Sequence, residues 1–530
     1  MRMMIRLTAA VLALPLALAG VGSACAADAE GMTLRFIPQA DLRVLDPMWT
    51  TANITRDHGY MIYDTLFALD EHFQPQPQMV ETWIVSEDKL AYTFVLRDRL
   101  KFHDGQPVRA VDCIASLQRW MKRDILGQSL AEAVVEMKAQ DDKTFAIILR
   151  KPFPLLLHAL AKLSGGTPFI MPERIAKTDA NTQIKEPIGS GPFKFVASEW
   201  EPGHKVVYVK NTDYVPRAEK PSLAAGGKVV KVDRVEWIYI PDPSTAANAL
   251  QAGEVDWWWQ APPDLVPLLE KRGDITVAAT DPIGFTGVLR FNQLEPPFDQ
   301  VKMRQAVLAA LDQGDYMAAV AGDKRFWRTC YSVYTCGTPM ASAAGAEPLK
   351  GKRDLTKAKA LVKAAGYKGE RIVLLDASDY PAVHAEALVT ADLLQRLGLN
   401  VDLQTSDWGT VLTRRAERGP VEEGGWSIFH TSFTGPDTLD PSVHLGLRAN
   451  GDKAWFGWPT DPKIEVLHDR WLASEDPAEQ KQIAAELQEE AFRTVPYIPI
   501  GQFAIPTAYR NNLSGLISSP VLEMWNVEKK

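Results

Sequence analysis

Two stretches of the 530-residue chain combine residue types that occur in catalytic sites. His103-Asp104-Gly105 pairs a base with a carboxylate, but Asp-Gly after a strand is a turn signal. Gly189-Ser190-Gly191 lacks the strand–turn–helix setting of a hydrolase nucleophile, and the proline that follows favours a tight structural crossing. The sequence contains no phosphate loop, dinucleotide fingerprint or zinc-protease motif. A secreted hydrolase is therefore a remote alternative, and we expect neither enzyme activity nor a cofactor.

The first 26 residues have the pattern of an export signal. Arg2 and Arg6 form a basic start, residues 7–21 are almost entirely apolar, and Ala24-Cys25-Ala26 puts small residues at a cleavage site. A lipoprotein anchored through Cys25 is the alternative, but the large aliphatic residue expected before a lipidated cysteine is missing. No later apolar run reaches the roughly 18 residues of a membrane span. We expect cleavage, and a soluble protein in the periplasm.

Export makes the remaining cysteines informative. Cys330 and Cys336 close a short loop, and an oxidising compartment favours a disulfide between them. Cys113 lies in a helical pattern and is expected to be a small buried hydrophobic residue. No paired Cys/His spacing accompanies these residues, and His430 stands alone, so we expect no metal site.

The composition describes a folded protein that does not bind nucleic acid. Apolar residues make up 46% and charged residues 23% of the chain, which excludes a disordered or coiled-coil protein. The net charge is −8, and cleavage after residue 26 removes two arginines and no acid, giving −10. Nucleic-acid binding needs a basic face. The length predicts two to four domains.

Two strand–helix–strand units indicate an α/β fold. In the first, strands at 235–240 and 255–259 flank a helix at 245–251; in the second, strands at 371–375 and 400–404 flank a helix at 381–397. Such crossovers imply parallel sheets with helices on their faces. Because about 100 residues separate the units, we expect two lobes, each with its own sheet.

Aromatic residues follow the predicted strands. Ligands of open α/β sheets bind beyond the carboxyl ends of the strands, where Trp259 and Trp408 stand. By alternation, residues 257–259 must present tryptophans to both sides of their strand. Phe433 and Tyr497 are weaker candidates for ligand contacts. The alternative for each aromatic residue is core packing.

Short motifs follow one another along nearly the whole mature chain. They include Leu45-Asp-Pro47, Ile62-Tyr-Asp-Thr-Leu-Phe67, Leu100-Lys-Phe-His-Asp-Gly-Gln-Pro107, Ile188-Gly-Ser-Gly-Pro-Phe193, Lys210-Asn-Thr-Asp-Tyr214 and Val495-Pro-Tyr-Ile-Pro499. In this order they resemble the family 5 extracellular solute-binding proteins, the peptide-binding type of receptor for ABC importers. Each motif alone is weak, whereas their ordered succession is specific.

The resemblance implies a two-lobed periplasmic binding protein fold with a hinge, in which lobe one has an extra inserted domain. Domain I would comprise residues 28–66, 186–285 and 496–530. Domain II, the insertion, would be 67–185, and Domain III, the second lobe, 286–495. The chain would cross between the lobes near residues 284–291 and 496–503.

The resemblance also implies a ligand anchor. In the peptide-binding members an Asp before an acidic-Pro pair holds the ligand's cationic amine, which is costly to bury unpaired. Asp437 has that spacing before Asp440-Pro441. The tryptophan that usually precedes this Asp is absent, which is a departure from the peptide-binding pattern. Because Asp437 lies in a loop rich in Gly, Pro and Asp, a turn role is an equal alternative. The loop after Leu45-Asp-Pro47 reaches the cleft in the family, which adds Trp49 and Thr51.

The family resemblance implies a receptor without catalysis. It would capture a small solute, expected to be a peptide or an amino-acid derivative, and deliver it to the permease subunits of an ABC importer at the inner membrane. Related members bind opines, oligosaccharides or metal chelates, and these are the alternative cargoes. The two-lobe layout predicts a monomer that closes around its ligand.

Overall fold

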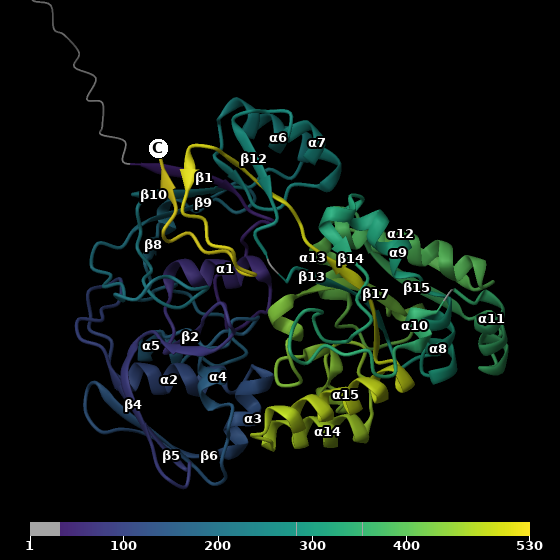
Figure 1. Cartoon of the computed structure of the whole chain (residues 1–530), viewed down its shortest axis with the longest axis horizontal. Coiled ribbons are helices and arrows are strands. Elements are labelled where there is room, and N and C mark those ends of the chain that lie inside the picture. The colour runs from purple at the N-terminus through teal and green to yellow at the C-terminus, as the bar shows by residue number, and fades with distance from the viewer. Residues whose placement is uncertain (1–31, 282, 352) are drawn as a thin grey trace, which may run out of the picture. The chain divides into compact units, whose positions relative to one another are not determined.

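The computed structural model describes residues 32–281, 283–351 and 353–530. The predicted export signal, with its cleavage site and Cys25, lies outside these residues. Residues 32–530 form one compact unit that contains three larger sheets (Figure 1). Within the described part, no helix is long and apolar enough to cross a membrane.

A seven-stranded sheet gathers strands from three separate parts of the chain, in the order β12-β19-β11-β1-β10-β9-β8. Its strands are β1 (Thr33–Ile37), β8 (Phe193–Phe195), β9 (Lys205–Lys210), β10 (Arg234–Ile238), β11 (Trp257–Trp258), β12 (Ile275–Ala278) and β19 (Thr507–Arg510). β1 pairs in parallel with β10 and β11, and β9 and β19 run antiparallel to their neighbours. The helices of this part are α1 (Asn53–Ile62), α6 (Pro243–Ala252) and α7 (Val266–Leu269).

A four-stranded antiparallel sheet, in the order β4-β5-β7-β6, lies between β1 and β8 in the sequence. Its strands are β4 (Val80–Val85), β5 (Ala91–Leu96), β6 (Val134–Ala139) and β7 (Thr144–Leu149), and the short pair β2 (Phe67–Leu69) and β3 (Pro75–Pro77) precedes it. Its helices are α2 (Ala110–Trp120), α3 (Ile125–Ala133), α4 (Leu156–Leu160) and α5 (Glu173–Ala176).

A six-stranded mixed sheet has the order β14-β18-β13-β17-β15-β16. Its strands are β13 (Phe285–Phe291), β14 (Trp327–Arg328), β15 (Arg371–Ala377), β16 (Asn400–Ser406), β17 (Ile428–Thr434) and β18 (Tyr497–Phe503). Its helices are α8 (Val301–Ala310), α9 (Gln313–Ala321), α10 (Glu347–Lys350), α11 (Leu355–Ala364), α12 (Pro381–Arg396), α13 (Trp408–Arg414), α14 (Pro462–Ala473) and α15 (Pro477–Thr494). A last short pair joins β20 (Leu513–Ser514) to β21 (Glu528–Lys529).

Both predicted strand–helix–strand units are present. β10, α6 and β11 form the first, and β1 lies between its two strands. β15, α12 and β16 form the second, with the two strands directly paired in parallel. At the start of α15 the Asp476 side chain accepts from the Ala478 amide, and Glu479 accepts from the Ser474 hydroxyl.

Strand pairing bears on the domain boundaries. β18 pairs with β13 in the six-stranded sheet, whereas the family resemblance put residues 496–530 in Domain I. The chain passes between the two large sheets at residues 279–284 and again at 504–506, which we call the two crossings. We therefore propose the expected segmentation with Domain I resuming at residue 504.

The two crossings touch at a glycine. Gly284 has a φ of +64°, and a Cβ atom there would lie 2.4 Å from the carbonyl oxygen of Phe503. Its own carbonyl oxygen accepts the Gly435 amide at 2.8 Å. A side chain at position 284 would therefore force the two crossings apart.

Two of the family motifs bind each other. The His103 amide donates to the Gly189 carbonyl oxygen at 2.8 Å, and its ring lies 3.2 Å from the Gly191 carbonyl oxygen. A Cβ at Gly189 would lie 1.9 Å from the carbonyl oxygen of Ile62, in a third motif. Burial lowers the pKa of His103 to about 4. The structural crossing predicted for this glycine motif is confirmed.

The disulfide between Cys330 and Cys336 is confirmed. Their Cα atoms are 5.8 Å apart. Cys113 is free and buried in α2, and burial raises the pKa of its thiol.

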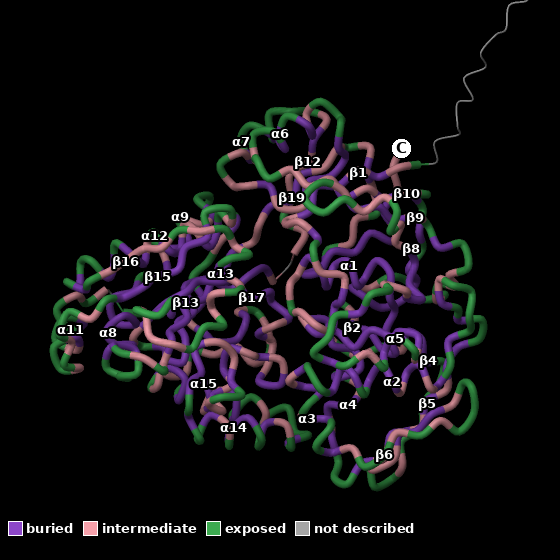
Figure 2. The backbone as a smooth tube through the Cα atoms, turned by 180° about the vertical axis from the view of Figure 1, so that it is seen from behind, coloured by how far each residue is buried: buried purple, intermediate pink, exposed green. Residues whose placement is uncertain are grey.

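Burial is deepest in β13, in β18 and in α1, where residues 54–62 are all buried (Figure 2). In the six-stranded sheet the core includes a polar pair, His430 on β17 and Glu386 on α12. His430 Nδ1 lies 3.8 Å from Glu386 Oε2, and both side chains are fully buried without a hydrogen-bond partner among the described residues. Burial raises the pKa of Glu386 well above its ordinary value and lowers that of His430 to about 3. Burial therefore favours the uncharged form of each group.

Glu386→Gln should change the pH dependence of stability. In the folded protein the pKa of Glu386 lies above its ordinary value of 4.5. The free energy of unfolding of the parent therefore falls as the pH rises through and beyond that value. The variant has no proton to lose there. Calorimetry should give equal melting temperatures at pH 4 and a higher one for the variant at pH 8. Glu489→Gln, at an exposed position of α15, is the matched control; parallel pH profiles for parent and Glu386→Gln would contradict the assignment.

Candidate functional site

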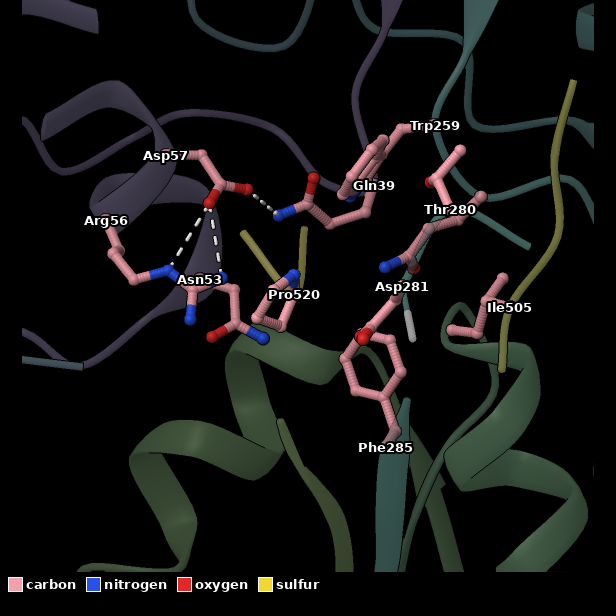
Figure 3. Close-up of a pocket in the computed structure, with 11 residues that line it drawn as sticks. Gln39, Asn53, Arg56, Asp57, Trp259, Thr280, Asp281, Phe285, Ile505 and Pro520 are labelled. Carbon is pink, nitrogen blue, oxygen red and sulfur yellow. Dashed lines mark hydrogen bonds and ion pairs between the residues drawn. The ribbon is translucent and has the colours of Figure 1, made fainter. Parts of the chain in front are cut away.

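A small pocket lies where both crossings leave the sheets (Figure 3). Its cavity of about 20 Å³ has room for roughly one water molecule. We call it the hinge pocket, and it is lined by Gln39, Asn53, Arg56, Asp57, Trp259, Gln260, Thr280, Asp281, Phe285, Ile505 and Pro520. In Figure 3 the α1 side chains lie to the left, and Thr280, Asp281 and Ile505 of the crossings to the right.

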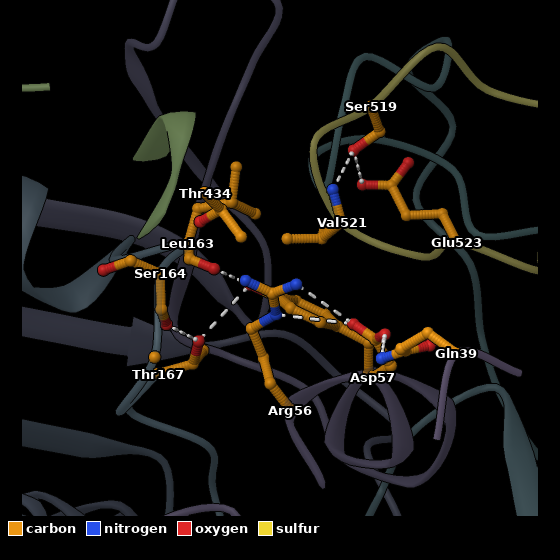
Figure 4. Close-up of polar contacts among 12 residues, drawn as sticks. Gln39, Arg56, Asp57, Leu163, Ser164, Thr167, Thr434, Ser519, Val521 and Glu523 are labelled. Carbon is orange, nitrogen blue, oxygen red and sulfur yellow. Dashed lines mark hydrogen bonds and ion pairs between the residues drawn. The ribbon is translucent and has the colours of Figure 1, made fainter. Parts of the chain in front are cut away.

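A buried ion pair forms the α1 side of the hinge pocket. Arg56 Nη2 lies 3.2 Å from Asp57 Oδ1, and the Gln39 side-chain amide donates to Asp57 Oδ2 at 3.1 Å (Figure 4). Arg56 is 4% and Asp57 1% exposed. Burial raises the pKa of Asp57, and the Arg56 charge opposes that shift. Arg56 Nη1 and Gln39 Oε1 are buried and have no partner among the described residues.

Asp281, in the first crossing, supplies the second carboxylate. Its Oδ1 accepts the amides of Ile283 and Gly284 at 3.0 and 2.8 Å, whereas its Oδ2 is buried without a partner among the described residues. Burial raises the pKa of Asp281 to about 6, although the two backbone bonds and Arg56 lower it. The pocket therefore has a free donor on Arg56 and free acceptors on Gln39 and Asp281.

A third acid lies nearby on the C-terminal loop. Glu523 is buried, and its Oε1 accepts the Ser519 hydroxyl at 3.1 Å (Figure 4). Burial raises the pKa of Glu523 to about 8. Glu523, Arg56 and Asp57 all act electrostatically on the Tyr60 hydroxyl, so the three charged groups surround one residue of α1.

Trp259 is the sequence-predicted site residue that lines the hinge pocket. Its ring packs 5.6 Å from that of Trp257 and 6.4 Å from that of Phe36. The Trp257 indole donates to the Thr507 hydroxyl, and Trp258 packs in the separate cluster beneath α6. The two neighbouring tryptophans thus serve opposite faces of the sheet, as the alternation predicts.

Thr51 and Asp437 meet at Gly165, away from the residues that line the hinge pocket. The Gly165 amide donates to Asp437 Oδ1 at 3.3 Å, and a Cβ on Gly165 would lie 3.1 Å from Thr51 Cβ. Asp437 Oδ2 accepts the Thr434 amide at 2.9 Å and its hydroxyl at 2.6 Å. Both carboxylate oxygens of Asp437 therefore accept hydrogen bonds in this structure.

Trp49 is fixed by a buried ion pair beside it. Asp46 accepts the Trp49 amide at 3.2 Å and lies 2.8 Å from Arg119 Nη2. The Trp49 indole donates to the Asn181 carbonyl oxygen at 3.0 Å.

The remaining aromatic candidates lie in the second lobe, outside the lining of the hinge pocket. Phe433 packs against Trp455 at 5.4 Å, and the Tyr497 hydroxyl lies 2.8 Å from His444 Nε2. Trp408 packs against Tyr380 at 5.3 Å. Their role as ligand contacts stays a prediction.

The sequence did not predict the polar residues Gln39, Arg56, Asp57 and Asp281 of the hinge pocket. One signal was available, because Arg56 and Asp57 are adjacent opposite charges, and charged side chains on a buried helix have to be paired. Asp281 gave no signal of its own, because its partners depend on how the crossings fold.

The inserted segment and the second lobe meet through opposite charges. Lys89 Nζ lies 2.5 Å from Glu475 Oε2. His158 and Asp440 shift each other's pKa, and the Lys151 charge lowers that of Asp469. In each pair the basic group belongs to residues 67–185 and the acid to the second lobe.

Several known proteins are similar to this chain in sequence and in architecture. The family model for bacterial extracellular solute-binding proteins, family 5 Middle, matches residues 74–453. The protein named "Probable peptide ABC transporter periplasmic-binding protein y4tO" of Sinorhizobium fredii is 41% identical over 491 residues, 92% of each chain. The glutathione-binding protein GsiB of Shigella flexneri is 25% identical over 493 residues, 91% of each chain.

Solved structures agree on the fold. A dipeptide-binding protein from Pseudoalteromonas sp. SM9913, in complex with Met-Leu, superposes with a TM-score of 0.77 at 20% identity, covering 94% of this chain and all of its own. The binding protein AgaA from A. tumefaciens R10, in complex with agropinic acid, gives 0.79 at 23% identity, covering 94% of this chain and 99% of its own. Both are two-lobed periplasmic binding proteins. The chain therefore belongs to family 5 of the bacterial extracellular solute-binding proteins, the receptors of ABC importers.

Proposed function

We propose that this receptor captures a peptide or an amino-acid derivative between its lobes and delivers it to the permease subunits of its importer. The hinge pocket is the observation that supports this most. Native proteins rarely leave buried polar atoms unpaired, yet three residues that line this pocket, Arg56, Gln39 and Asp281, each have one such atom without a partner among the described residues. A polar group of a ligand that reaches the pocket would supply a missing partner.

The relatives support the same ligand class. The 41% identical protein is named for peptides, and the solved structures hold a dipeptide and an opine acid. We further propose that the export signal is cleaved, that the mature protein is a periplasmic monomer, and that it catalyses no reaction.

Thermal-shift screening tests this proposal. Purified residues 27–530 should melt at a higher temperature with a dipeptide or amino-acid derivative, because the ligand binds only the folded protein. Oligosaccharides and metal chelates complete the panel, and a rise confined to them would reject the proposed class. Release of product from generic ester and peptide substrates would restore the hydrolase alternative.

Asp437 is the proposed anchor for a positively charged group, and two substitutions separate this role from capping. Asp437→Asn retains an acceptor for Gly165 but loses the charge, whereas Asp437→Ala loses both. If Asp437 holds a cation, both variants should weaken binding by ~2–5 kcal/mol in calorimetry. Asp440→Ala is the control, because its carboxylate accepts the Ser442 amide and hydroxyl and should affect stability instead. Binding by Asp437→Asn at parental strength would leave Asp437 a capping residue only.

The ion pair between Lys89 and Glu475 should favour closure of the two lobes around the ligand. Lys89→Glu replaces a partly exposed attraction with repulsion, which is worth roughly 1 kcal/mol, and should lower the affinity for the screened ligand about fivefold at low salt. The double variant Lys89→Glu/Glu475→Lys should regain the parental affinity. The matched control is Lys185→Glu, an exposed lysine of the same inserted segment. Failure of the double variant to recover would mean that the pair does not contribute to binding.

A further inference from the structure

The disulfide loop, residues 330–336, contacts a short turn of the candidate site, residues 434–438, which we call the anchor turn. The Thr335 amide donates to the Thr438 carbonyl oxygen at 3.0 Å. The Thr335 hydroxyl donates to the Gly435 carbonyl oxygen at 2.9 Å and lies 2.6 Å from the Thr438 hydroxyl. One residue of the disulfide loop therefore binds the anchor turn near both of its ends.

The hydroxyl protons of this cluster can be assigned, because each hydroxyl has a single proton to donate. The Thr335 hydroxyl gives its proton to Gly435, so the proton between the two hydroxyls comes from Thr438. Both threonine side chains are fully buried, and water cannot replace a lost partner. Removal of the Thr335 hydroxyl would leave a carbonyl oxygen and a hydroxyl of the anchor turn without this partner, which is costly in a buried place.

Thr335 is itself held from two sides. The Gln313 side chain accepts the Cys330 amide at 2.7 Å and donates to the Cys330 carbonyl oxygen at 2.8 Å, which fixes the start of the disulfide loop. Cys336, the residue directly after Thr335, is bound to Cys330 through the disulfide. The disulfide thus fixes the place from which Thr335 reaches the anchor turn.

The position of Asp437 follows from that of the anchor turn. Its carboxylate accepts the Thr434 amide and hydroxyl, which fixes the side chain relative to the turn but not the turn relative to the lobe. Strand β17 and the bond from the Gly435 amide to the Gly284 carbonyl oxygen fix the start of the turn. Thr335 fixes its end.

We propose that Thr335 is a positioning residue, which the disulfide holds in place and which orients the anchor turn so that Asp437 meets the solute. The proposal rests on the receptor function and on the role of Asp437 proposed above. A loop that only stabilised the second lobe would change the melting temperature alone. The two roles are therefore separated by measurements on the turn itself.

Hydrogen exchange followed by mass spectrometry tests the positioning without any solute. Thr335→Val keeps the branched shape of the side chain and removes the hydroxyl, and it should speed exchange about tenfold in peptides that contain the Thr434 and Gly435 amides. Thr335→Ser retains the hydroxyl and should restore the parental rate. The double variant Cys330→Ala/Cys336→Ala should also speed exchange in these peptides.

Thr390→Val is the matched control. Thr390 is buried in α12 of the same lobe, and its hydroxyl lies 2.8 Å from that of Tyr316, so the same substitution removes a similar buried bond. It should lower the melting temperature and leave exchange in the anchor turn at the parental rate. Parental exchange there in Thr335→Val or in the cysteine double variant would overturn the proposal, as would an equal acceleration in Thr390→Val.

Calorimetry with methionyl-leucine, the dipeptide in the solved Pseudoalteromonas relative, connects the positioning to binding. Thr335→Val should bind this dipeptide about tenfold more weakly than the parent. Because Thr335 acts through Asp437, the same change should have no further effect in the Asp437→Asn variant. An equal loss in both backgrounds would overturn the proposal. Absence of binding by the parent would count against the proposed ligand class, and hydrogen exchange would still decide the positioning.

Discussion

The ion pair between Asp46 and Arg119 joins the N-terminal loop of the first lobe to the inserted segment. Five donors meet the Asp46 carboxylate: two from Arg119 and the amides of Met48, Trp49 and Ile184. Both charged side chains are almost fully buried, and leaving either without its partner would cost about 3–5 kcal/mol. Loop 47–51, which leads to the contact between Thr51 and Gly165, is held in place by this pair.

The need to pair a buried charge also distinguishes charged groups that only stabilise the fold from charged groups that can bind a ligand. The buried Asp64 carboxylate lies 2.8 Å from Lys228 Nζ and accepts the Tyr214 hydroxyl at 2.9 Å. Its negative charge is therefore matched by the positive charge of Lys228. Asp281 is half-buried, and its Oδ2 atom has no partner among the described residues; burial raises the pKa of this carboxyl to about 6. A receptor can tolerate such a site when the ligand supplies the missing partner.

The sequence alone predicted the parts of the fold that depend on local residue patterns. The units around α6 and α12 follow from hydrophobic periodicity, from Gly253 and Gly398 after the helices, and from the crossover rule. The ordered motifs identified the family and the two-lobed fold. The hinge pocket could not be predicted, because Asp281 comes from a segment more than 200 residues away from Gln39 and Asp57. The assignment of β18 to the second sheet also depended on long-range pairing that local pattern does not encode.

Asp281 connects the pocket to the crossings. One carboxylate oxygen holds the Ile283 and Gly284 amides in the first crossing, and Gly284 in turn packs against Phe503 at the second. A ligand shifts the equilibrium between open and closed lobes only as far as it binds one state better. Asp281 lines the hinge pocket and also holds the first crossing through its carboxylate, so a group bound in the pocket would act directly on one of the two segments that join the lobes.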